Sequence, residues 1–277
     1  MARASGPAPG DPFRGRVAVV TGGAAGIGLA MAQAFAARGA SLVLADIDTS
    51  ALARAERELA AAGAEVLGVA ADVTRRESVE ALANAAFARF GAVHLLCNNA
   101  GIAVLGPLVG ADAGEWRKAM DVNFWGVVHG IDAFLPRMLA QRAGGHVVNT
   151  ASMAGLVGMQ WLGIYCATKF AVVGLSESLR RELEPAGIGV SVLCPMMVAT
   201  GIGENSARVL GRPSPAAADA GAAPGVALQG AVIEASEVAR RVVRAIETNS
   251  FYVFTHPEQR EILRRHAARQ AAVFEQE

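Results

Sequence analysis

The chain has 277 residues, of which 53% are hydrophobic and 18% are charged, and its 25 basic and 25 acidic side chains balance. This length and apolar fraction allow a single domain with a sizeable core. A formal net charge of zero argues against a protein that finds nucleic acid or an anionic membrane surface by long-range attraction. We therefore expect neither of these as a partner.

The spacing of the cysteines and histidines argues against two further classes of protein. Cys97, Cys166 and Cys194 lie far apart within apolar runs and form no disulfide pattern. Such usage is typical of a reducing compartment, so we expect a cytoplasmic protein. The five histidines show no ligand spacing to one another or to a cysteine, and we expect no metal site.

Alternating strand and helix patterns predict the fold class. Residues 1–13, rich in Pro, Gly and Ala, are expected to form a disordered leader, and residues 14–277 a single domain. Seven short apolar runs are continuous, as in strands buried on both faces. They span 17–20, 41–45, 66–70, 93–98, 146–151, 190–194 and 251–255. Helical patterns separate them, which predicts an α/β fold: a doubly wound parallel sheet of about seven strands with helices on both faces.

Three segments between the strands carry specific expectations. A helix is expected over 74–90, where Thr74 and Glu77 form a capping box, and a longer helix over 113–143. Residues 201–230 follow the sixth predicted strand and are rich in Ala, Gly and Pro toward their end. We interpret them as a substrate lid at the carboxyl end of the sheet, with a disordered surface insertion as the alternative.

A glycine-rich turn between the first strand and the first helix is typical of a dinucleotide-binding site. The sequence at 21–28 is Thr-Gly-Gly-Ala-Ala-Gly-Ile-Gly. Glycines allow a tight turn and a close approach of the backbone to a pyrophosphate, and the helix N-terminus supplies amide donors. The residues expected to bind the cofactor here are Gly22, Ala25, Gly26, Ile27 and Gly28.

The end of the second strand predicts which dinucleotide binds. Asp46 follows the glycine-rich turn at close to the offset where a carboxylate binds the adenosine ribose hydroxyls. This carboxylate would repel a 2′-phosphate, and neither Ala25 nor Ile47 offers a cation to bind one. NAD is therefore favoured over NADP. Further cofactor contacts are expected from Ile47 and, at the ends of the third and fourth strands, from Asp72, Val73, Asn99, Ala100 and Gly101.

A tyrosine and a lysine four residues apart suggest a reacting centre. The chain has two tyrosines, and one of them, Tyr165, precedes Lys169 by one helical turn, so the two side chains face the same way. A free phenol has a pKa of about 10 and is a poor base at neutral pH, so it needs positive charge nearby. Lys169 can supply that charge. Ser152 at the end of the fifth strand and Asn123 complete the candidate set.

Together these motifs resemble the short-chain dehydrogenase/reductase family. The resemblance covers roughly residues 15–200 and rests on the turn at 21–28, Asn-Asn-Ala-Gly at 98–101, Asn123, Ser152, Tyr165 and Lys169. It implies a single-domain Rossmann fold with strand order 3-2-1-4-5-6-7, NAD(P)-linked oxidoreduction, and assembly as a homotetramer, a dimer of dimers.

The resemblance also implies a role for each catalytic position. Tyr165 matches the family's acid/base, and Ser152 matches the hydroxyl that binds the substrate oxygen. Lys169 matches the residue that holds the nicotinamide ribose and helps to stabilise the phenolate. Asn123 matches the helix residue that orders water in a proton relay through Lys169.

The segment after the sixth strand both follows and departs from the family pattern. Pro195, Val198 and Thr200 match positions near the nicotinamide carboxamide. Met196 stands where the family usually has glycine, which bears on the local backbone path and adds an apolar side chain near the substrate.

The expected substrate pocket is apolar and rich in methionine. Its residues are Ser152, Met153, Met159, Trp161, Tyr165, Met196 and Met197. Methionine adapts to irregular shapes, and no basic residue lies in these segments to bind an anion. We predict a hydrophobic secondary alcohol or its ketone, of steroid, terpenoid or aryl-alkyl type. The alternative, that these methionines only pack the core, remains open.

Two other functions also remain open at this point. A 3-oxoacyl thioester reductase is less favoured because a basic patch for an acidic carrier is missing. A non-catalytic dinucleotide-binding sensor is less favoured because the Ser152, Tyr165 and Lys169 set is intact. The helix pattern over 163–185 has more apolar positions than one buried face needs, so a four-helix contact with a second copy of the chain is expected.

Overall fold

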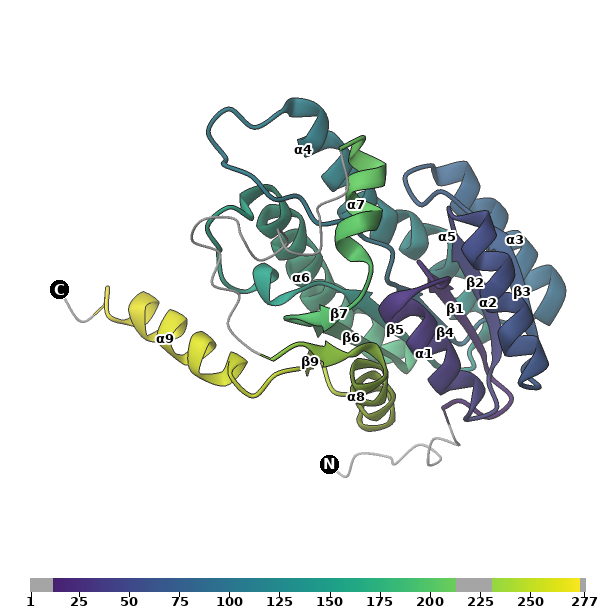
Figure 1. Ribbon diagram of the computed structural model, residues 1–277. Coiled ribbons are helices and arrows are strands. Elements are labelled where there is room, and N and C mark those ends of the chain that lie inside the picture. The colour runs from purple at the N-terminus through teal and green to yellow at the C-terminus, as the bar shows by residue number, and fades with distance from the viewer. Residues whose placement is uncertain (1–11, 213–230, 275–277) are drawn as a thin grey trace, which may run out of the picture.

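The computed structural model describes residues 12–212 and 231–274 (Figure 1). Seven parallel strands form its central sheet in the order β3-β2-β1-β4-β5-β6-β9. They are β1 (Val17–Thr21), β2 (Ser41–Asp46), β3 (Val66–Ala70), β4 (Leu95–Asn98), β5 (Gly145–Thr150), β6 (Ile188–Cys194) and β9 (Tyr252–Phe254). The predicted α/β fold and strand order are confirmed, with β9 as the seventh strand of the sheet.

Helices cover both faces of this sheet (Figure 1). One face packs against α1 (Gly26–Ala36), α2 (Thr49–Ala61) and α8 (Ala235–Thr248). The other packs against α3 (Arg76–Phe90), α5 (Gly126–Gln141) and α6 (Gly163–Leu183). Successive strand residues serve opposite faces: Val19 joins the second core and Val20 the first, and both are fully buried. The continuous apolar runs in the sequence follow from this burial on both faces.

The topology brings the candidate motifs to one edge of the sheet. The chain runs from β1 through β2 to β3 on one side, and then returns to place β4 on the other side of β1. Because the strands are parallel, the segments that follow β1 and β4 diverge at their carboxyl ends. In doubly wound sheets this point of divergence is where ligands bind.

One helix lies inside the segment expected to form the lid, and two short strands flank that segment. Strand β7 (Val198–Ala199) pairs with β8 (Ile233–Glu234) in a separate two-stranded sheet, and α7 (Ile202–Leu210) follows β7. The remainder of the expected lid, 213–230, lies outside the described residues.

Three sequence-based expectations need correction. The disordered leader was expected to end at residue 13, but Phe13 is fully buried and its ring stacks on that of Phe35 with the ring centres 5.3 Å apart. Residues 1–11 of the expected leader lie outside the described residues. The capping box is absent: α3 begins at Arg76, and the Thr74 hydroxyl donates to Asp72 instead of capping the helix. The helix expected over 113–143 is interrupted.

That interruption is a π-helical turn. The segment divides into α4 (Ala113–Met120), the π-helical turn η1 (Asp121–Trp125) and α5 (Gly126–Gln141). A π turn inserts one residue into the helical repeat, which sequence periodicity does not reveal, and such turns are frequent at functional sites. Asn123 lies in the middle of η1.

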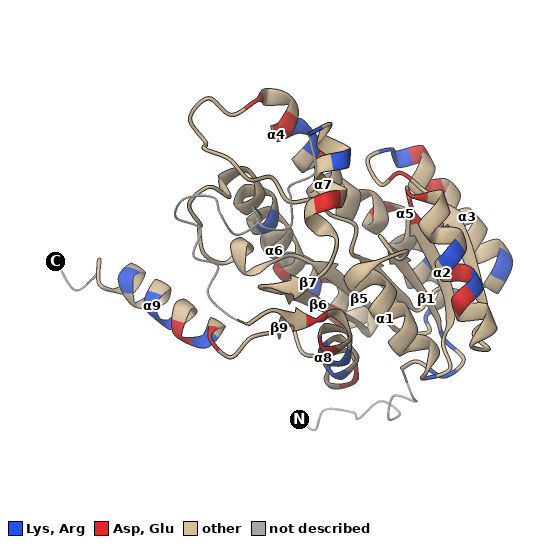
Figure 2. Ribbon diagram, viewed as in Figure 1, with Lys and Arg blue, Asp and Glu red and all other residues tan. Residues whose placement is uncertain are grey.

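The last helix, α9 (Gln259–Ala271), projects from the body of the protein (Figure 1). Figure 2 shows acidic and basic residues intermixed along α8 and α9. Glu237 and Glu261 each form ion pairs with arginines of their own helix. Within residues 12–212 and 231–274, no helix combines the length and apolar character needed to cross a membrane.

Candidate active site

A cavity of about 630 Å³ lies beyond the carboxyl ends of β1 and β4. It gathers side chains and backbone from widely separated parts of the sequence. The predicted cofactor residues that line it are Gly22, Ala25, Gly26, Ile27, Asp46, Ile47, Asp72, Val73, Asn99, Ala100, Gly101, Tyr165, Lys169, Pro195 and Thr200. Gly28 and Val198 do not line it: Gly28 packs against the Gly22 carbonyl, and Val198 pairs with Ile233.

The glycine-rich turn has the shape of a pyrophosphate cradle. Gly22 has a φ of +62°, and a Cβ there would lie 3.0 Å from the Cα of Ala100. Gly26 opens α1 with a φ of +53°. Among the described residues, no side chain caps the start of α1, and Gly26 and Ile27 of its first turn line the cavity, where backbone amides can donate to an anion. The backbone here therefore fits a dinucleotide.

Asp46 is held at the edge of this cavity by backbone amides. One carboxylate oxygen accepts from the Ala24 amide at 3.1 Å and the other from the Asp48 amide at 3.0 Å. Asp48 caps α2, as the sequence allows, because its side chain accepts from the amides of Ser50 and Ala51. The carboxylate of Asp46 is thus fixed in orientation and remains available to hydroxyl donors in the cavity.

The floor of the cavity is tied together by two polar side chains. Asn99 donates to the Thr21 carbonyl at 3.1 Å and accepts from the Thr150 hydroxyl at 3.2 Å, and so connects β1 with β5. The Thr21 hydroxyl accepts from the amides of Asn99 and Ala100 at 2.9 and 3.1 Å. These bonds hold the start of the Asn-Ala-Gly segment close under the glycine-rich turn.

Tyr165 and Lys169 line the cavity, and Ser152 lies beside Tyr165. Ser152 lies directly before a 3₁₀ turn, and its hydroxyl contacts both the Tyr165 phenol and the Pro195 carbonyl, the latter at 3.4 Å. The Lys169 ammonium lies 5.6 Å from the centre of the Tyr165 ring and donates to the Thr150 carbonyl at 2.9 Å. The structure therefore brings together the hydroxyl, phenol and ammonium that the sequence predicted as a set.

Burial changes the proton affinity of both titratable groups. It raises the pKa of Tyr165 to about 12, although the hydrogen bond with Ser152 lowers it. It lowers the pKa of Lys169 to about 8. The lowering of the phenol pKa that Lys169 was expected to cause is not seen in the chain alone, where the loss of water around the phenol is the largest effect on its pKa. At pH 7 the phenol is neutral and suited to donate a proton.

Asn123 is fully buried and has a complete set of partners. Its side-chain oxygen accepts from the Ile102 amide at 2.8 Å, and its nitrogen donates to the Ile102 carbonyl at 2.9 Å and to the Thr168 hydroxyl at 3.0 Å. The side chain thus fixes the segment after β4 against α6. The part that Asn123 takes in a proton relay stays a prediction.

The predicted substrate residues lie in the segments that flank Ser152 and Pro195, and none of Met153, Met159, Trp161, Met196 and Met197 lines the cofactor cavity. Met153 is 1% exposed, and its sulfur accepts from Gln259, so packing explains its burial. Met159, Trp161, Met196 and Met197 are partly exposed. Met196 does not have the positive φ that would require glycine, so the departure from the family pattern is accommodated without strain.

Sequence reasoning missed several charged residues of the cavity. Arg54, Lys118, Asp121 and Arg208 line it. The Lys118 ammonium donates to the Val209 carbonyl of α7 at 3.4 Å. Arg208 pairs with Asp48 at 3.2 Å across the outer end of the cavity. A lone basic residue in a helix gives no sequence signal for such contacts, because they depend on where α7 lies.

Comparisons with known proteins agree with this geometry. A sequence model described as short chain dehydrogenase matches residues 16–209. A 1-deoxy-11-beta-hydroxypentalenate dehydrogenase from Streptomyces exfoliatus is 40% identical over 90% of this chain and 86% of its own length. A C alpha-dehydrogenase from Sphingobium sp. is 33% identical over 92% of this chain and 85% of its own. A solved short chain dehydrogenase/reductase from Burkholderia phymatum, in complex with NAD, superposes with a TM-score of 0.85 at 44% identity, covering 94% of this chain and 96% of the other.

The doubly wound fold and its cavity define a dinucleotide-binding oxidoreductase. Within that class, the chain belongs to the short-chain dehydrogenase/reductase family, whose members bind a nicotinamide dinucleotide. It is an enzyme of the alcohol dehydrogenase type, acting on CH–OH groups.

Proposed function

We propose that the protein is an NAD-dependent oxidoreductase that interconverts a hydrophobic secondary alcohol and its ketone, with Tyr165 as the acid/base. The observation that carries this proposal is that Tyr165 and Lys169 line the same cavity as the glycine-rich turn and Asp46, with Ser152 beside the Tyr165 phenol. The nicotinamide, when bound, accepts or supplies the hydride. The protein's residues provide the orientation and the proton.

Each residue of the set has a distinct task. The Ser152 hydroxyl donates a hydrogen bond to the substrate oxygen and fixes its position beside the phenol. Tyr165 gives a proton to that oxygen during ketone reduction and takes it back during alcohol oxidation. Lys169, with its ammonium 5.6 Å from the ring centre, stabilises the phenolate and holds the nicotinamide ribose. Oxidation needs more positive charge at this site than the chain alone supplies, because burial holds the phenol pKa at about 12.

The first prediction tests this mechanism. Tyr165→Phe removes the proton donor and leaves the ring, so kcat for secondary alcohol oxidation should fall by about 100-fold or more. Steady-state NADH formation from a panel of cyclic and aryl secondary alcohols measures this loss. Tyr252→Phe is the matched control, because Tyr252 lies on β9 with its hydroxyl bonded to Glu177. Equal turnover by Tyr165→Phe and the wild-type enzyme would refute the mechanism.

The second prediction concerns the cofactor. Asp46 presents a carboxylate to the adenosine end of the cavity, so kcat/KM should be higher with NAD(H) than with NADP(H). Arg54 and Arg208 also line the cavity, and they would attract a 2′-phosphate. The Asp46 carboxylate determines the preference for NAD because backbone amides fix its position, whereas Arg208 is exposed and already paired with Asp48. Measured kcat/KM values that favour NADP(H) would overturn this assignment.

The substrate class is proposed from the apolar character of Met159, Trp161, Met196 and Met197, and covers steroid, terpenoid and aryl-alkyl alcohols. The relative named as a hydroxypentalenate dehydrogenase supports a bulky hydroxylated substrate. Higher activity on acyl-carrier 3-oxoacyl thioesters than on any alcohol would favour the thioester reductase. Binding of NADH without turnover of any alcohol or ketone would favour a sensor.

We further propose that the protein is a cytoplasmic homo-oligomer. Trp125 on η1 and Phe170 on α6 are 47% and 43% exposed, although Phe124 and Val173 of the same elements pack into the core. These exposed rings support a homo-oligomer, a dimer of dimers, in which they are buried. The three cysteines are buried free thiols, which supports a reducing, cytoplasmic setting.

A further inference from the structure

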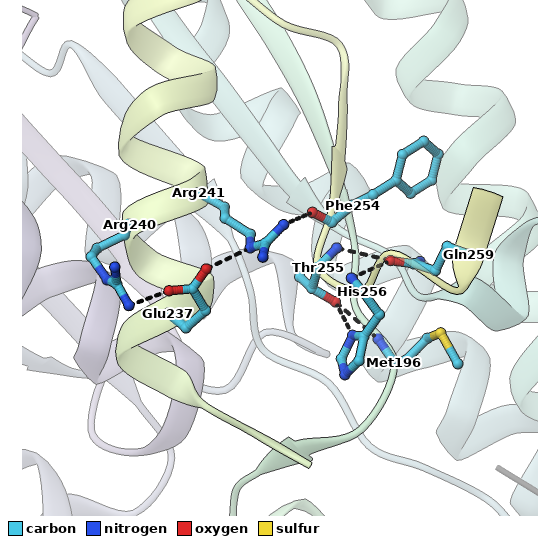
Figure 3. A network of polar contacts seen from close by, with 8 residues as sticks. All are labelled: Met196, Glu237, Arg240, Arg241, Phe254, Thr255, His256 and Gln259. Atoms are coloured by element: carbon cyan, nitrogen blue, oxygen red, sulfur yellow. Dashed lines mark hydrogen bonds and ion pairs between the residues drawn. The ribbon is translucent and has the colours of Figure 1, made fainter. Parts of the chain in front are cut away.

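A buried polar network lies where β9 ends and α9 begins (Figure 3). The residues at its centre are Thr255, His256 and Gln259, which are 1%, 4% and 1% exposed. The side-chain oxygen of Gln259 accepts from the amides of Thr255 and His256 at 2.8 and 2.9 Å. This part of the network closes the turn on itself and needs no partner elsewhere in the chain.

The rest of the network reaches toward the active site. The Gln259 side-chain nitrogen donates to the Cys194 carbonyl at 2.7 Å, and the Thr255 hydroxyl accepts from the Met196 amide at 3.3 Å. These two bonds hold the peptide groups on either side of Pro195. The Pro195 carbonyl in turn accepts from the Met153 amide at 2.9 Å and from the Ser152 hydroxyl at 3.4 Å.

The proton positions in this network follow from the chemistry of its members. The Ala231 carbonyl can only accept, so the His256 Nε2, 2.8 Å away, must donate to it. In the neutral ring the Nδ1 then accepts, and the Thr255 hydroxyl at 2.7 Å donates to it. The Thr255 oxygen is therefore free to accept from Met196. Each of these hydrogen bonds has one donor and one acceptor, which fixes the orientation of the hydroxyl.

We propose that Thr255 and Gln259 are positioning residues for Ser152: by holding the Cys194 carbonyl and the Met196 amide, they set the position of the Pro195 carbonyl, which competes with Tyr165 and the substrate oxygen for the single proton of the Ser152 hydroxyl. This inference rests on the proposed function. The bond from Ser152 to Pro195 is long, so a small shift of that carbonyl decides whether the hydroxyl turns to the backbone or to the substrate.

The same turn also bonds residues 231–233, which pair with the segment after Pro195. His256 bonds Ala231, and two residues later the Ile233 amide donates to the Met197 carbonyl at 3.1 Å. The C-terminal turn thus sets the position of the Ser152 hydroxyl and of the backbone at Met196 and Met197 together. Misplacement by about 1 Å at such a site lowers turnover by up to about 100-fold.

The test uses the full-length protein and the secondary alcohol that the wild-type enzyme oxidises best. Thr255→Val keeps the shape of the side chain but loses both hydrogen bonds, and Thr255→Ser keeps them. We expect kcat to fall by about tenfold or more in Thr255→Val, with a smaller change in the Kd for NADH measured by fluorescence, and to recover in Thr255→Ser. Gln259→Leu should show the same loss. Arg241→Ala is the matched control, because Arg241 donates to the Phe254 carbonyl of the same turn from its exposed side (Figure 3).

The pH profile separates positioning from a general loss of structure. Because the hydrogen bond with Ser152 lowers the pKa of Tyr165, a displaced Ser152 should move the pH profile of alcohol oxidation to higher pH. A fraction of unfolded protein, measured by circular dichroism, would reduce the amplitude without moving the profile. Wild-type kcat and profile in both folded Thr255→Val and Gln259→Leu, or a loss that matches the unfolded fraction, would overturn the inference. Absence of turnover by the wild-type enzyme would instead refute the proposed function.

Discussion

At the scale of single residues, one cause has opposite effects on two neighbours. Burial raises the pKa of Tyr165 to about 12 and lowers that of Lys169 to about 8, since it penalises the charged form of each. Lys169 is 3% exposed and has a single backbone carbonyl, that of Thr150, as its hydrogen-bond acceptor among the described residues. A buried ammonium in this state costs stability, and it is kept where a compact positive charge is needed.

This gives a prediction about stability. Lys169→Met should abolish alcohol oxidation and yet raise the free energy of unfolding at pH 7 by about 1 to 3 kcal/mol, measured by urea denaturation. The sign follows from proton binding. Between the folded pKa of about 8 and the ordinary value of 10.5, the unfolded chain holds a proton that the folded chain has lost. Wild-type stability therefore rises with pH across this window, and the advantage of the variant should shrink. A variant less stable than wild type at pH 7 would contradict this account.

At the scale of elements, α7 is a helix within the segment that the sequence predicted to be a lid. The sequence suggested a mobile cover over residues 201–230, and the structure describes a helix over Ile202–Leu210. Its last turn pairs Arg208 with Asp48, while Lys118 of α4 donates to Val209. Figure 1 shows α7 beside α4. The helix therefore lies across the outer end of the cavity between two otherwise separate helices.

The ion pair of α7 should affect cofactor release. Arg208→Ala should increase the rate at which NADH dissociates by roughly two- to fivefold, the range expected for an exposed pair, and the difference should shrink at high salt. Stopped-flow fluorescence measures the rate. Arg240→Ala removes a comparable exposed ion pair on α8 and should leave release unchanged. If both variants release NADH at the wild-type rate in low salt, α7 does not restrain the cofactor.

At the scale of the whole molecule, the exposed rings of Trp125 and Phe170 predict self-association. On α6, Val173, Leu179 and Leu183 are buried, as the helical pattern predicts, whereas Phe170 is 43% exposed. Phe170→Glu should reduce the mass measured by light scattering to that of a smaller assembly. Val109, 92% exposed in a loop, provides the control: Val109→Glu should leave the mass unchanged. A wild-type protein that is monomeric at micromolar concentration would refute the expected assembly.

The sequence by itself determined the fold class and most of the candidate cofactor site. Continuous apolar strands alternating with helices allow few arrangements other than a parallel sheet, and parallel strands bring every strand-end motif to one edge. The pair Tyr165 and Lys169 was readable because a helix brings residues four apart together without help from the rest of the chain.

The tertiary structure decided the features whose partners are distant in sequence. Asn123 of the π turn bonds the peptide groups of Ile102, and Arg208 of α7 pairs with Asp48. Gln259 reaches Cys194, 65 residues earlier in the chain. A buried polar side chain must find its partner wherever the fold supplies one, and no local pattern encodes where that is.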